Sequence, residues 1–435
     1  MTLSSQTITP LLPFFSFSEQ CKAALVKEMV GKKLNELRTP TLVIDRKIVQ
    51  RNCEKLGKAS AELNIKVRVH VKTHKTIEGA EIQLSGTQTD AIVVSTMAEA
   101  HYMINSRLTE SGLLKEVLLG FPISPDKFND VLGLSKKVPK FLIFIDNVIT
   151  LNALEEFLEQ KYGPDVPTQK INVFLKVDCG YHRAGAPLGD PTTLELAKRL
   201  QNSTYVDFYG IYTHAGHSYS AKSAIDGLEY LKTECDMARR SRNYFSSNGV
   251  AVKAVSIGAT PTIHAVMKYA QEDKENIKQV LDGITELHAG AFSFLDRQQA
   301  ATGLCTLKDI AISVVSRVAS KYSDRDSILI DGGALAFSKD TAPQGGFGYV
   351  LDPAVKPDIN QEPTVLATLT KVAQEHGVIA DLDSSILSRP DLGIGSLIRV
   401  LPNHCCLTAA SHMYYLIVED GSDIVLDVWI PIKGW

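Results

Sequence analysis

Short runs of apolar, mostly β-branched residues alternate with helix-compatible segments through the first two thirds of the chain. There are eight of these runs, at residues 67–72, 90–95, 116–120, 141–146, 172–178, 209–214, 254–258 and 284–290. Continuous apolar strands that alternate with helices are typical of a parallel sheet covered on both faces. Eight such units over about 250 residues match a closed (β/α)8 barrel. An open doubly wound sheet is the alternative, which we favour less because no glycine-rich dinucleotide motif follows the first strand.

The pattern changes after about Asp296. The C-terminal part consists of short segments in which apolar and polar residues alternate, broken by Gly, Pro, Asn and Asp. This pattern predicts an antiparallel β domain. An early strand, TPTLVID at residues 39–45, is free to join it. The sequence therefore predicts an α/β protein with a (β/α)8 barrel over residues 46–295 and a discontinuous, mainly antiparallel β domain formed by residues 1–45 and 296–435.

Two helices are predicted before the first barrel strand. A helical pattern runs from about Ser18 to Leu37. Another helix of about four turns follows the TPTLVID strand, because Val49, Cys53, Leu56 and Leu63 fall at helical spacing. Asp45, immediately before this second helix, is a suitable N-cap residue.

The composition excludes several classes of partner. The 435 residues are 44% hydrophobic and 22% charged with a net charge of −3, so neither nucleic acid nor an anionic membrane is expected as a partner. No apolar run reaches the roughly 18 residues that a membrane-spanning helix needs. The N-terminal TPLLPFFSF is short, interrupted by prolines and not preceded by basic residues, so we expect no secretory signal. Seven cysteines without regular spacing indicate reduced thiols and a cytoplasmic protein.

A basic cluster follows the first barrel strand, in the stretch VRVHVKTHKT. Most of the eight strands end in a polar residue or glycine, and in a barrel these ends meet on the face that carries active sites. Lys72 lies at such an end. Lysine is seldom buried without a partner, because desolvation disfavours the ammonium form and lowers its pKa. The neutral amine that burial favours can form a Schiff base with a carbonyl cofactor. The alternative is that Lys72, His74 and Lys75 form an ordinary basic loop.

A histidine and a cysteine two positions apart, His404 and Cys406, lie in the stretch PNHCCLT. Imidazole and thiolate together suit zinc, whereas an oxygen ligand in place of the thiolate would suit magnesium or manganese. We expect an extended strand here, which would place both side chains on one face and Cys405 on the other. Two protein ligands leave positions open for water or substrate, as a catalytic zinc site requires. A buried strand with incidental cysteines is the alternative interpretation.

Three stretches together resemble one family of enzymes. They are HVKTHKT around Lys72, DCGYHRAG at the end of the fifth strand, and PNHCC near the C-terminus. A barrel with a lysine at the end of its first strand, followed by an all-β domain, resembles the alanine racemase-like enzymes that use pyridoxal 5'-phosphate (PLP), known as fold type III. Within that class the three stretches resemble the eukaryotic D-serine dehydratases, with the D-threonine aldolases as close relatives. The resemblance covers nearly the whole chain.

The resemblance implies roles for several residues at the barrel mouth. Lys72 matches the Schiff-base lysine, and Arg183 matches the residue that holds the phenolic oxygen of the cofactor. Taken from the sequence alone, Arg183 could instead form an ion pair with Asp178. His214 matches the histidine that lies against the pyridine face, and His288 matches a partner of the pyridine nitrogen.

Further candidate contacts with the cofactor surround these positions. Tyr219, on the loop beyond His214, and Tyr181, near Arg183, are the aromatic candidates. The cofactor phosphate needs backbone N–H donors on small residues, often at a helix N-terminus. The stretch SIGATPT and the eighth strand supply such residues, although a plain turn is the alternative; the candidates are Gly258, Thr260, Gly290 and Ala291.

The resemblance also implies a reaction and its competitors. The expected reaction is β-elimination of water from D-serine, giving pyruvate and ammonia, with PLP and Zn2+ as cofactors. The His404–Cys406 pair separates the dehydratases from the aldolases, which carry a carboxylate at the second position. The alternatives are an aldolase acting on D-threonine or another D-3-hydroxy amino acid, a racemase with a second base on the opposite ring face, and a non-enzymatic PLP carrier, which would resemble the barrel alone. A homodimer is expected by resemblance only.

Overall fold

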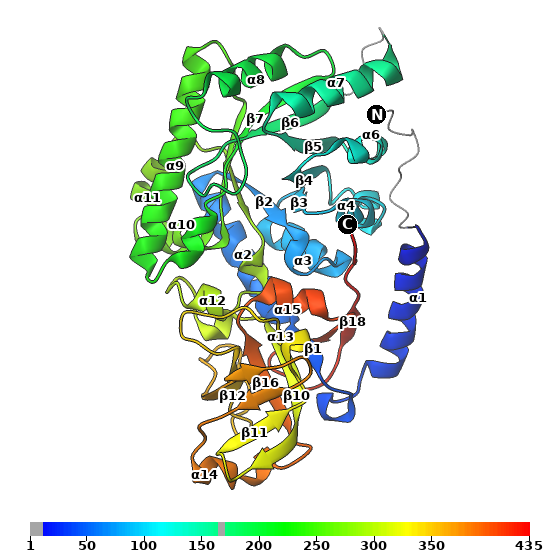
Figure 1. The fold of residues 1–435 in the computed structure, drawn as a ribbon, viewed down its shortest axis with the longest axis vertical. Coiled ribbons are helices and arrows are strands. Elements are labelled where there is room, and N and C mark those ends of the chain that lie inside the picture. The colour runs from blue at the N-terminus through cyan, green and yellow to red at the C-terminus, as the bar shows by residue number, and fades with distance from the viewer. Residues whose placement is uncertain (1–11, 164–169) are drawn as a thin grey trace.

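Eight parallel strands close into a barrel (Figure 1). The computed structural model describes residues 12–163 and 170–435. Each strand pairs with the next along the chain and the last pairs with the first; they are β2 (Lys66–His70), β3 (Ala91–Val94), β4 (Glu116–Pro122), β5 (Lys140–Ile145), β6 (Ile171–Lys176), β7 (Val206–Tyr212), β8 (Ala254–Ile257) and β9 (Glu286–Ala289). The predicted barrel is confirmed and the open sheet is wrong.

Helices surround the barrel (Figure 1), and most of them connect successive strands. They are α2 (Arg46–Leu63), α3 (Ile77–Thr87), α4 (Met97–Ile104), α5 (Arg107–Glu110), α6 (Phe128–Ser135), α7 (Val148–Tyr162), α8 (Pro191–Asn202), α9 (Ala224–Ser247), α10 (Thr260–Glu272), α11 (Lys274–Val280) and α12 (Arg297–Ala300). The predicted N-cap of α2 is confirmed, because Asp45 Oδ1 accepts hydrogen bonds from the backbone N–H groups of Lys47 and Ile48 at 3.1 and 3.4 Å. The predicted apolar face of α2 is buried.

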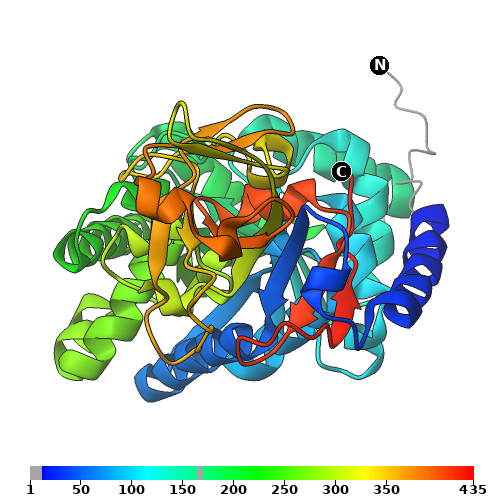
Figure 2. The ribbon, with the colours of Figure 1, turned by 90° about the horizontal axis from the view of Figure 1, so that it is seen from below.

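The first strand of the chain belongs to a second, mainly antiparallel sheet. β1 (Thr41–Asp45) lies between β10 (Ile312–Tyr322) and β17 (Tyr415–Val418), and Figure 2 shows it in blue beside strands from the C-terminal part. The remaining strands are β11 (Ser327–Ile330), β12 (Gly348–Leu351), β13 (Val365–Thr368), β14 (Lys371–Val372), β15 (Gly377–Ile379), β16 (Leu397–Pro402) and β18 (Asp427–Trp429). The predicted antiparallel sheet is confirmed. The domain boundaries at residues 46 and 295 remain our proposal.

The antiparallel sheet packs against the barrel at the C-terminal ends of the barrel strands. Helix α15 (Cys405–Ser411) packs on the turn Val71–Thr73, which follows β2, and α13 (Ala334–Phe337) packs on α15. In Figure 1 both helices lie between the barrel and the sheet, whereas α14 (Ser384–Leu387) lies at the far end of the β domain. Residues from the C-terminal part therefore reach the barrel mouth.

The N-terminal helix α1 (Leu12–Met29) ends earlier than the predicted limit at Leu37. Gly31 follows it with a φ of +86°, a left-handed conformation that glycine adopts without steric cost. The backbone N–H of Gly31 donates a hydrogen bond to the carbonyl of Val425 at 2.8 Å. The chain therefore turns toward the β domain after α1 instead of continuing as a helix.

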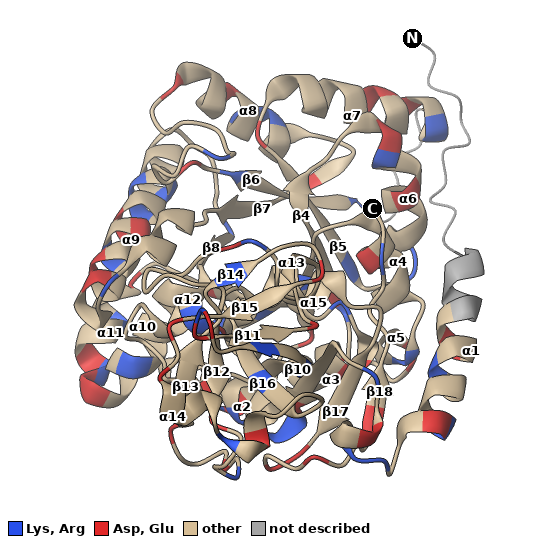
Figure 3. Cartoon of the chain, turned by 60° about the horizontal axis from the view of Figure 1, so that its bottom comes forward, with Lys and Arg blue, Asp and Glu red and all other residues tan. Residues whose placement is uncertain are grey.

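Charged side chains of both signs are interspersed over the outer helices (Figure 3). Some pair locally, such as Lys268 and Glu272, which lie one turn apart on α10 with a 2.9 Å ion pair. Among residues 12–163 and 170–435, no helix combines the length and apolarity that crossing a membrane requires.

Candidate active site

Lys72 lies in the single 3-10 turn that follows β2, at the barrel mouth. The Nδ1 atom of His70 accepts a hydrogen bond from the backbone N–H of Lys72 at 3.3 Å and so helps to hold this turn. The Lys72 side chain is half-buried, and no hydrogen bond or ion pair to its Nζ is found in the described part of the chain. Its positive charge adds to burial in lowering the pKa of His70 and of His214, so both rings lie near the amine.

The other basic residues of this stretch have structural partners. Lys75 Nζ forms a 2.9 Å ion pair with Glu99, which is fully buried. His74 is also fully buried, and its Nε2 lies 3.0 Å from Gln83 Oε1. Lys72 is therefore the one basic residue of the three whose side-chain nitrogen lacks a partner among the described residues.

Two further histidines lie at strand ends of the barrel. His214 follows β7, and its Nδ1 donates a hydrogen bond to the carbonyl of Gly258 at 2.8 Å. His288 lies in β9, its Nδ1 is 3.0 Å from Ser256 Oγ, and its buried Nε2 has no hydrogen-bond partner in the described residues. The two rings are nearly parallel, with centroids 6.2 Å apart. Burial lowers the pKa of both histidines well below its usual value, so both are neutral near pH 7.

Arg183 and Tyr181 lie on the exposed loop that follows β6. The Arg183 guanidinium stands over the Tyr181 ring, 5.3 Å from its centroid, and this ring is 6.5 Å from that of His214. Asp178 pairs with the Nδ1 of His182 at 2.7 Å, and within the described residues it forms no ion pair with Arg183. The structural alternative for Arg183 therefore has no support, and its guanidinium remains available to a ligand.

The turn after β8 differs in part from the predicted phosphate cradle. Gly258 has a φ of +149°, and a Cβ at this position would stand 2.1 Å from the His288 carbonyl oxygen, so only glycine fits. The Gly258 N–H donates to Glu234 Oε1 at 3.1 Å, which removes it from the donors available to a phosphate. Helix α10 begins at Thr260, and the first N–H groups of a helix have no intrahelical acceptor. The N-terminus of α10 is therefore the part of this turn that can still bind an anion.

Gly290, Ala291 and Tyr219 border the same space. A Cβ on Gly290 would stand 3.0 Å from the Cβ of His70, so the ends of β2 and β9 pack closely. Ala291 is buried and begins the 3-10 turn that follows β9. Burial raises the pKa of Tyr219, whose side chain is hydrogen-bonded with that of Thr260. These residues therefore line the mouth next to the N-terminus of α10.

Glu234 on α9 is a site residue that the sequence analysis missed. Its Oε1 accepts hydrogen bonds from the Thr213 hydroxyl at 2.9 Å and from the N–H groups of Ala215 and Gly258 at 3.1 Å each. The carboxylate thus joins the turn after β7, which carries His214, to the turn after β8. The available signal was an acidic residue on the apolar face of a helix, which does not by itself indicate these partners.

Lys176 at the end of β6 is a second residue that was missed. It is buried, and its Nζ lies over the rings of Phe144 and Tyr212, 4.9 and 5.2 Å from their centroids. Burial and the charge of Arg183 lower the pKa of Lys176 to about 8. The available signal was a lysine within the apolar strand NVFLKVD.

His404 and Cys406 lie on the β-domain side of the mouth, at the N-terminal end of α15. The predicted extended strand is wrong here, because His404 is the N-cap residue of α15 and Cys406 lies in its first turn. The reason is Asn403, whose side-chain amide donates to two backbone carbonyls at 2.8 and 2.7 Å and turns the chain away from β16. Cys405 is buried rather than turned away, and its Sγ is 4.0 Å from that of Cys406.

The pKa values of His404 and Cys406 shift in opposite directions. Hydrogen bonds from Cys405 and His404 lower the pKa of the Cys406 thiol well below its usual value, although burial opposes this shift. Burial also opposes protonation of His404, but the Cys406 thiolate, Asp296 and Asp340 together raise the pKa of this imidazole to about 9. The pair is therefore an imidazolium and a thiolate near pH 7.

Helix α15 brings this pair against the turn that carries the lysine. The hydroxyl of Thr73 is 3.2 Å from Cys406 Sγ, and the charge of Lys72 contributes to the low pKa of the thiol. The Lys72 charge lowers the pKa of Tyr219 and the Cys406 thiol raises it, so both groups lie near this side chain. The barrel side and the β-domain side thus form one site.

The β-domain side fits a zinc ion held by two residues. A thiolate and an imidazole are ligand types that zinc takes. Asp340 Oδ2 is 2.5 Å from His404 Nδ1, the carboxylate–histidine arrangement that orients a metal-binding ring and leaves its Nε2 for the metal. Across the described residues, no group of three or more His, Cys, Asp and Glu is arranged to hold a metal. A zinc ion here would therefore keep open positions.

The barrel side fits PLP. Among the described residues, neither the Lys72 amine nor the buried Nε2 of His288 has a hydrogen-bond partner, and the N-terminus of α10 offers N–H groups that can bind an anion. A buried acceptor without a partner costs about 1–3 kcal/mol. A bound ligand would remove that cost.

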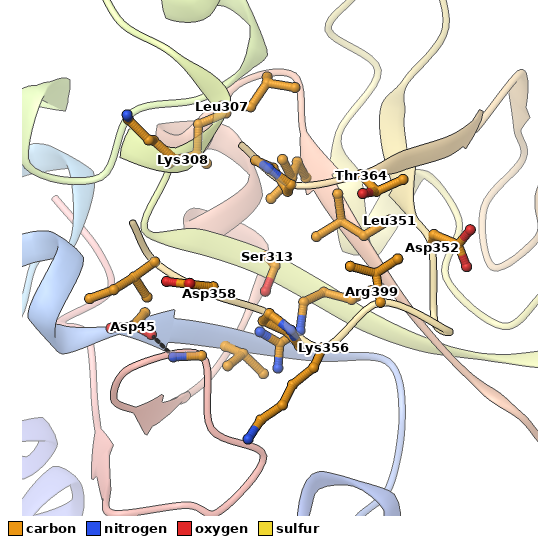
Figure 4. Close-up of a pocket in the computed structure, with 18 of the residues that line it drawn as sticks. Asp45, Leu307, Lys308, Ser313, Leu351, Asp352, Lys356, Asp358, Thr364 and Arg399 are labelled. Carbon is orange, nitrogen blue, oxygen red and sulfur yellow. Dashed lines mark hydrogen bonds between the residues drawn. The ribbon is translucent and has the colours of Figure 1, made fainter. Parts of the chain in front are cut away.

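A cavity of about 340 Å³ lies elsewhere, in the β domain (Figure 4). Its walls include Ser313, Arg399 and Lys356, but none of the predicted site residues. Asp45, also in the wall, is already occupied, because it caps α2 and its Oδ2 accepts a hydrogen bond from the Gly421 N–H at 2.8 Å. This cavity is therefore separate from the candidate active site.

Two family profiles match the chain. The family described as "Alanine racemase, N-terminal domain" matches residues 44–274, and the one described as "Putative serine dehydratase domain" matches residues 311–418. The first match spans the barrel up to α11, and the second covers most of the antiparallel sheet.

Individual relatives agree with both matches. The D-serine dehydratase of Schizosaccharomyces pombe is 34% identical over 420 residues, which cover 95% of this chain and 96% of that protein. Two solved variants of D-threo-3-hydroxyaspartate dehydratase align with TM-scores of 0.78 at 25% identity. One replaces a cysteine by alanine, is in a metal-free form and aligns over 93% of this chain and 100% of its own. The other replaces a histidine two positions earlier by alanine and aligns over 97% and 100%.

Proposed function

We propose that this chain converts D-serine into pyruvate and ammonia, because it belongs to the D-serine dehydratase family. Members of this family are lyases with the alanine racemase-like fold. The proposed cofactors of this chain are PLP and Zn2+. The observation that carries the proposal is the 3.2 Å contact between Cys406 Sγ and the hydroxyl of Thr73, the residue after Lys72. An unpartnered amine and a thiolate–imidazole pair, the two kinds of group that elimination of water requires, lie at one site.

In this proposal the barrel residues hold PLP. Lys72 binds it through its amine, Arg183 faces its phenolic oxygen, His214 lies against its ring, and His288 meets its pyridine nitrogen. The N-terminus of α10 at Thr260 receives the phosphate. The remaining candidates line the pocket; they are Tyr181, Tyr219, Gly258, Gly290 and Ala291.

The metal is assigned to His404 and Cys406, with Asp340 orienting the imidazole. The low pKa of the Cys406 thiol supports this assignment, because the thiolate is the form that binds zinc. The relatives give further support: the solved variants of D-threo-3-hydroxyaspartate dehydratase replace a histidine and a cysteine two positions apart, the spacing of His404 and Cys406, and one of them is metal-free.

Bound PLP supplies an electron sink for the charge left on Cα, and bound zinc supplies a Lewis acid. Once the substrate occupies the site, the Lys72 amine is free to accept the Cα proton. Tyr219, which lies near both Lys72 and Cys406, is the neighbouring side chain for this transfer. Loss of the β-hydroxyl as water gives aminoacrylate, which takes up one water to give pyruvate and ammonia. The overall reaction therefore consumes no water and no redox partner.

The proposal is tested by product formation from D-serine, L-serine and D-threonine, before and after treatment with a zinc chelator. We expect pyruvate from D-serine alone, abolished by the chelator and restored by zinc. Acetaldehyde and glycine from D-threonine without pyruvate from D-serine would identify an aldolase instead. Racemised serine would identify a racemase, and PLP binding without any turnover a carrier.

The oligomeric state and the cellular location are two further predictions. The full chain should form a homodimer, for which light scattering would give twice the 47.6 kDa of one chain. The cytoplasmic location predicted from the cysteines is tested by fractionation of cells that produce the protein.

A further inference from the structure

A chain of buried polar groups lies behind His288. The His288 Nδ1 is 3.0 Å from Ser256 Oγ, and the Ser256 hydroxyl donates to Glu286 Oε1 at 2.8 Å. The two carboxylate oxygens of Glu286 each accept a 3.0 Å hydrogen bond from the guanidinium of Arg68. All four residues are at most 4% exposed, and they lie on the neighbouring strands β2, β8 and β9.

The hydrogen-bond partners determine where the protons are. Glu286 pairs with Arg68 through both oxygens, so its carboxylate is ionised and can only accept. The single proton of Ser256 therefore goes to Glu286, and the Ser256 oxygen is left to accept from His288. It follows that the proton of the neutral imidazole is on Nδ1 and that Nε2 carries a lone pair.

Burial keeps the imidazole in this neutral form, since it lowers the pKa of His288 well below its usual value. The ring is also held in position, because it stacks on Tyr212 with a centroid distance of 3.9 Å and an interplanar angle of 13°. Nε2 is therefore a fixed acceptor, and a group that contacts it must be a donor. Nε2 has no partner among the described residues, so none of these residues supplies that donor.

We propose, on the basis of the proposed function, that the donor is the protonated pyridine nitrogen of PLP, and that Arg68, Glu286 and Ser256 are positioning residues that impose this protonation state through His288. The pyridine nitrogen is the only atom of the PLP ring itself that can be protonated and then donate a hydrogen bond. A histidine protonated on Nε2 would instead donate and favour the unprotonated ring. A pyridinium withdraws more electron density from Cα, so the chain of hydrogen bonds strengthens the electron sink.

The test uses apo-enzyme loaded with PLP labelled with 15N at the pyridine nitrogen, without substrate. NMR of the wild-type holoenzyme should give the chemical shift of a pyridinium. In Ser256→Ala the Nδ1–H of His288 loses its acceptor, so the proton is expected to move to Nε2. The label should then shift to the position of an unprotonated pyridine.

Two more variants complete the test. In Glu286→Gln the amide can donate to Ser256, whose own proton is then free for His288 Nδ1, so the same shift to unprotonated pyridine is expected. Arg68 keeps its 2.8 Å hydrogen bond to Glu116 in this variant. Ser241→Ala is the matched control, because Ser241 is also fully buried but bonds only to the carbonyl of Met237, at 2.8 Å; here the pyridinium signal should persist.

The outcomes separate this inference from the proposed function. An unprotonated pyridine in the wild type, or a pyridinium that persists in both Ser256→Ala and Glu286→Gln, overturns the positioning role alone. Failure of the wild type to take up PLP overturns the proposed function and this inference with it. A pyridinium that responds to both variants in a protein that does not convert D-serine would uphold the positioning role and overturn the proposed reaction.

Discussion

Histidines on the two sides of this site have opposite protonation states. On the barrel side, His214 and His288 are buried against a carbonyl and a hydroxyl, so burial lowers the pKa of each and the rings are neutral. On the β-domain side, His404 is also largely buried, yet the Cys406 thiolate, Asp296 and Asp340 raise its pKa to about 9. The neighbouring groups, rather than the degree of burial, therefore decide the charge.

The difference indicates a division of labour. Neutral, fixed imidazoles suit an organic cofactor whose ring must be bound without placing a positive charge next to it. A thiolate beside an imidazole that is held by a carboxylate suits a metal ion, which replaces the imidazole proton when it binds. In our account the barrel side governs loss of the Cα proton and the β-domain side governs loss of the β-hydroxyl.

The largest effect is expected from Lys72→Ala, which removes the amine that both holds PLP and accepts the proton. Turnover of D-serine should fall about 1,000-fold or more, and the absorbance of bound PLP should disappear after dialysis. Lys253→Ala is the control, because Lys253 is an exposed lysine that pairs only with the exposed Asp207 among the described residues. Activity that survives in Lys72→Ala at the wild-type rate would show that the barrel side has been assigned wrongly.

Cys406→Ala should impair only the β-domain side of the site. We expect bound PLP to be retained, but the rate of pyruvate formation to fall about 100-fold or more, because a Lewis acid contributes several kcal/mol to such a step. Cys405→Ala, which removes a hydrogen bond to the Cys406 thiolate but no proposed ligand, should lower the rate less. Full activity of Cys406→Ala in the presence of a chelator would remove zinc from the mechanism.

Asp340→Asn tests how the carboxylate of Asp340 supports the metal-binding imidazole on the β-domain side. The amide can still contact His404 but no longer carries the charge that orients and polarises the ring, so zinc affinity should fall about 10- to 100-fold. Competition with a zinc-binding dye measures this change, and PLP affinity should stay the same. Asp383→Asn, at an exposed position of the β domain, is the control. Equal zinc affinity in the two variants would contradict the role of Asp340.

The smallest effect concerns the stability of the apo-enzyme at acid pH. His70, His214 and His288 are neutral when folded but bind protons below about pH 6.5 when unfolded, so the free energy of unfolding should decrease as pH falls below that value. His288→Gln removes one of the groups that bind a proton on unfolding. The free energy of unfolding of this variant should therefore depend less on pH than that of the wild type, with a slope smaller by about 1.4 kcal/mol per pH unit. Urea unfolding between pH 7.5 and 5.5 measures both slopes. Identical slopes would mean that His288 is protonated in the folded protein.

The sequence predicted the barrel because each strand is a local apolar run. It also predicted the position of Lys72 at the barrel mouth, because this residue directly follows such a run. His404 and Cys406 were assigned to a strand, which is wrong, since the hydrogen bonds of Asn403 near the start of α15 join segments distant in sequence. Glu234 and Asp340 were missed for the same reason: His404 lies 64 residues from Asp340. Pattern analysis detects local periodicity, whereas these contacts exist only in the folded chain.

The division of labour is tested most directly by the exchange of the Cα proton of D-serine in deuterated water, followed by NMR in the Cys406→Ala variant loaded with PLP. The account predicts that this variant still exchanges the Cα proton, because the barrel side with Lys72 is intact, while it forms almost no pyruvate. Simultaneous loss of exchange and elimination, with PLP still bound, would contradict it, since the two sides of the site would then act in a single step.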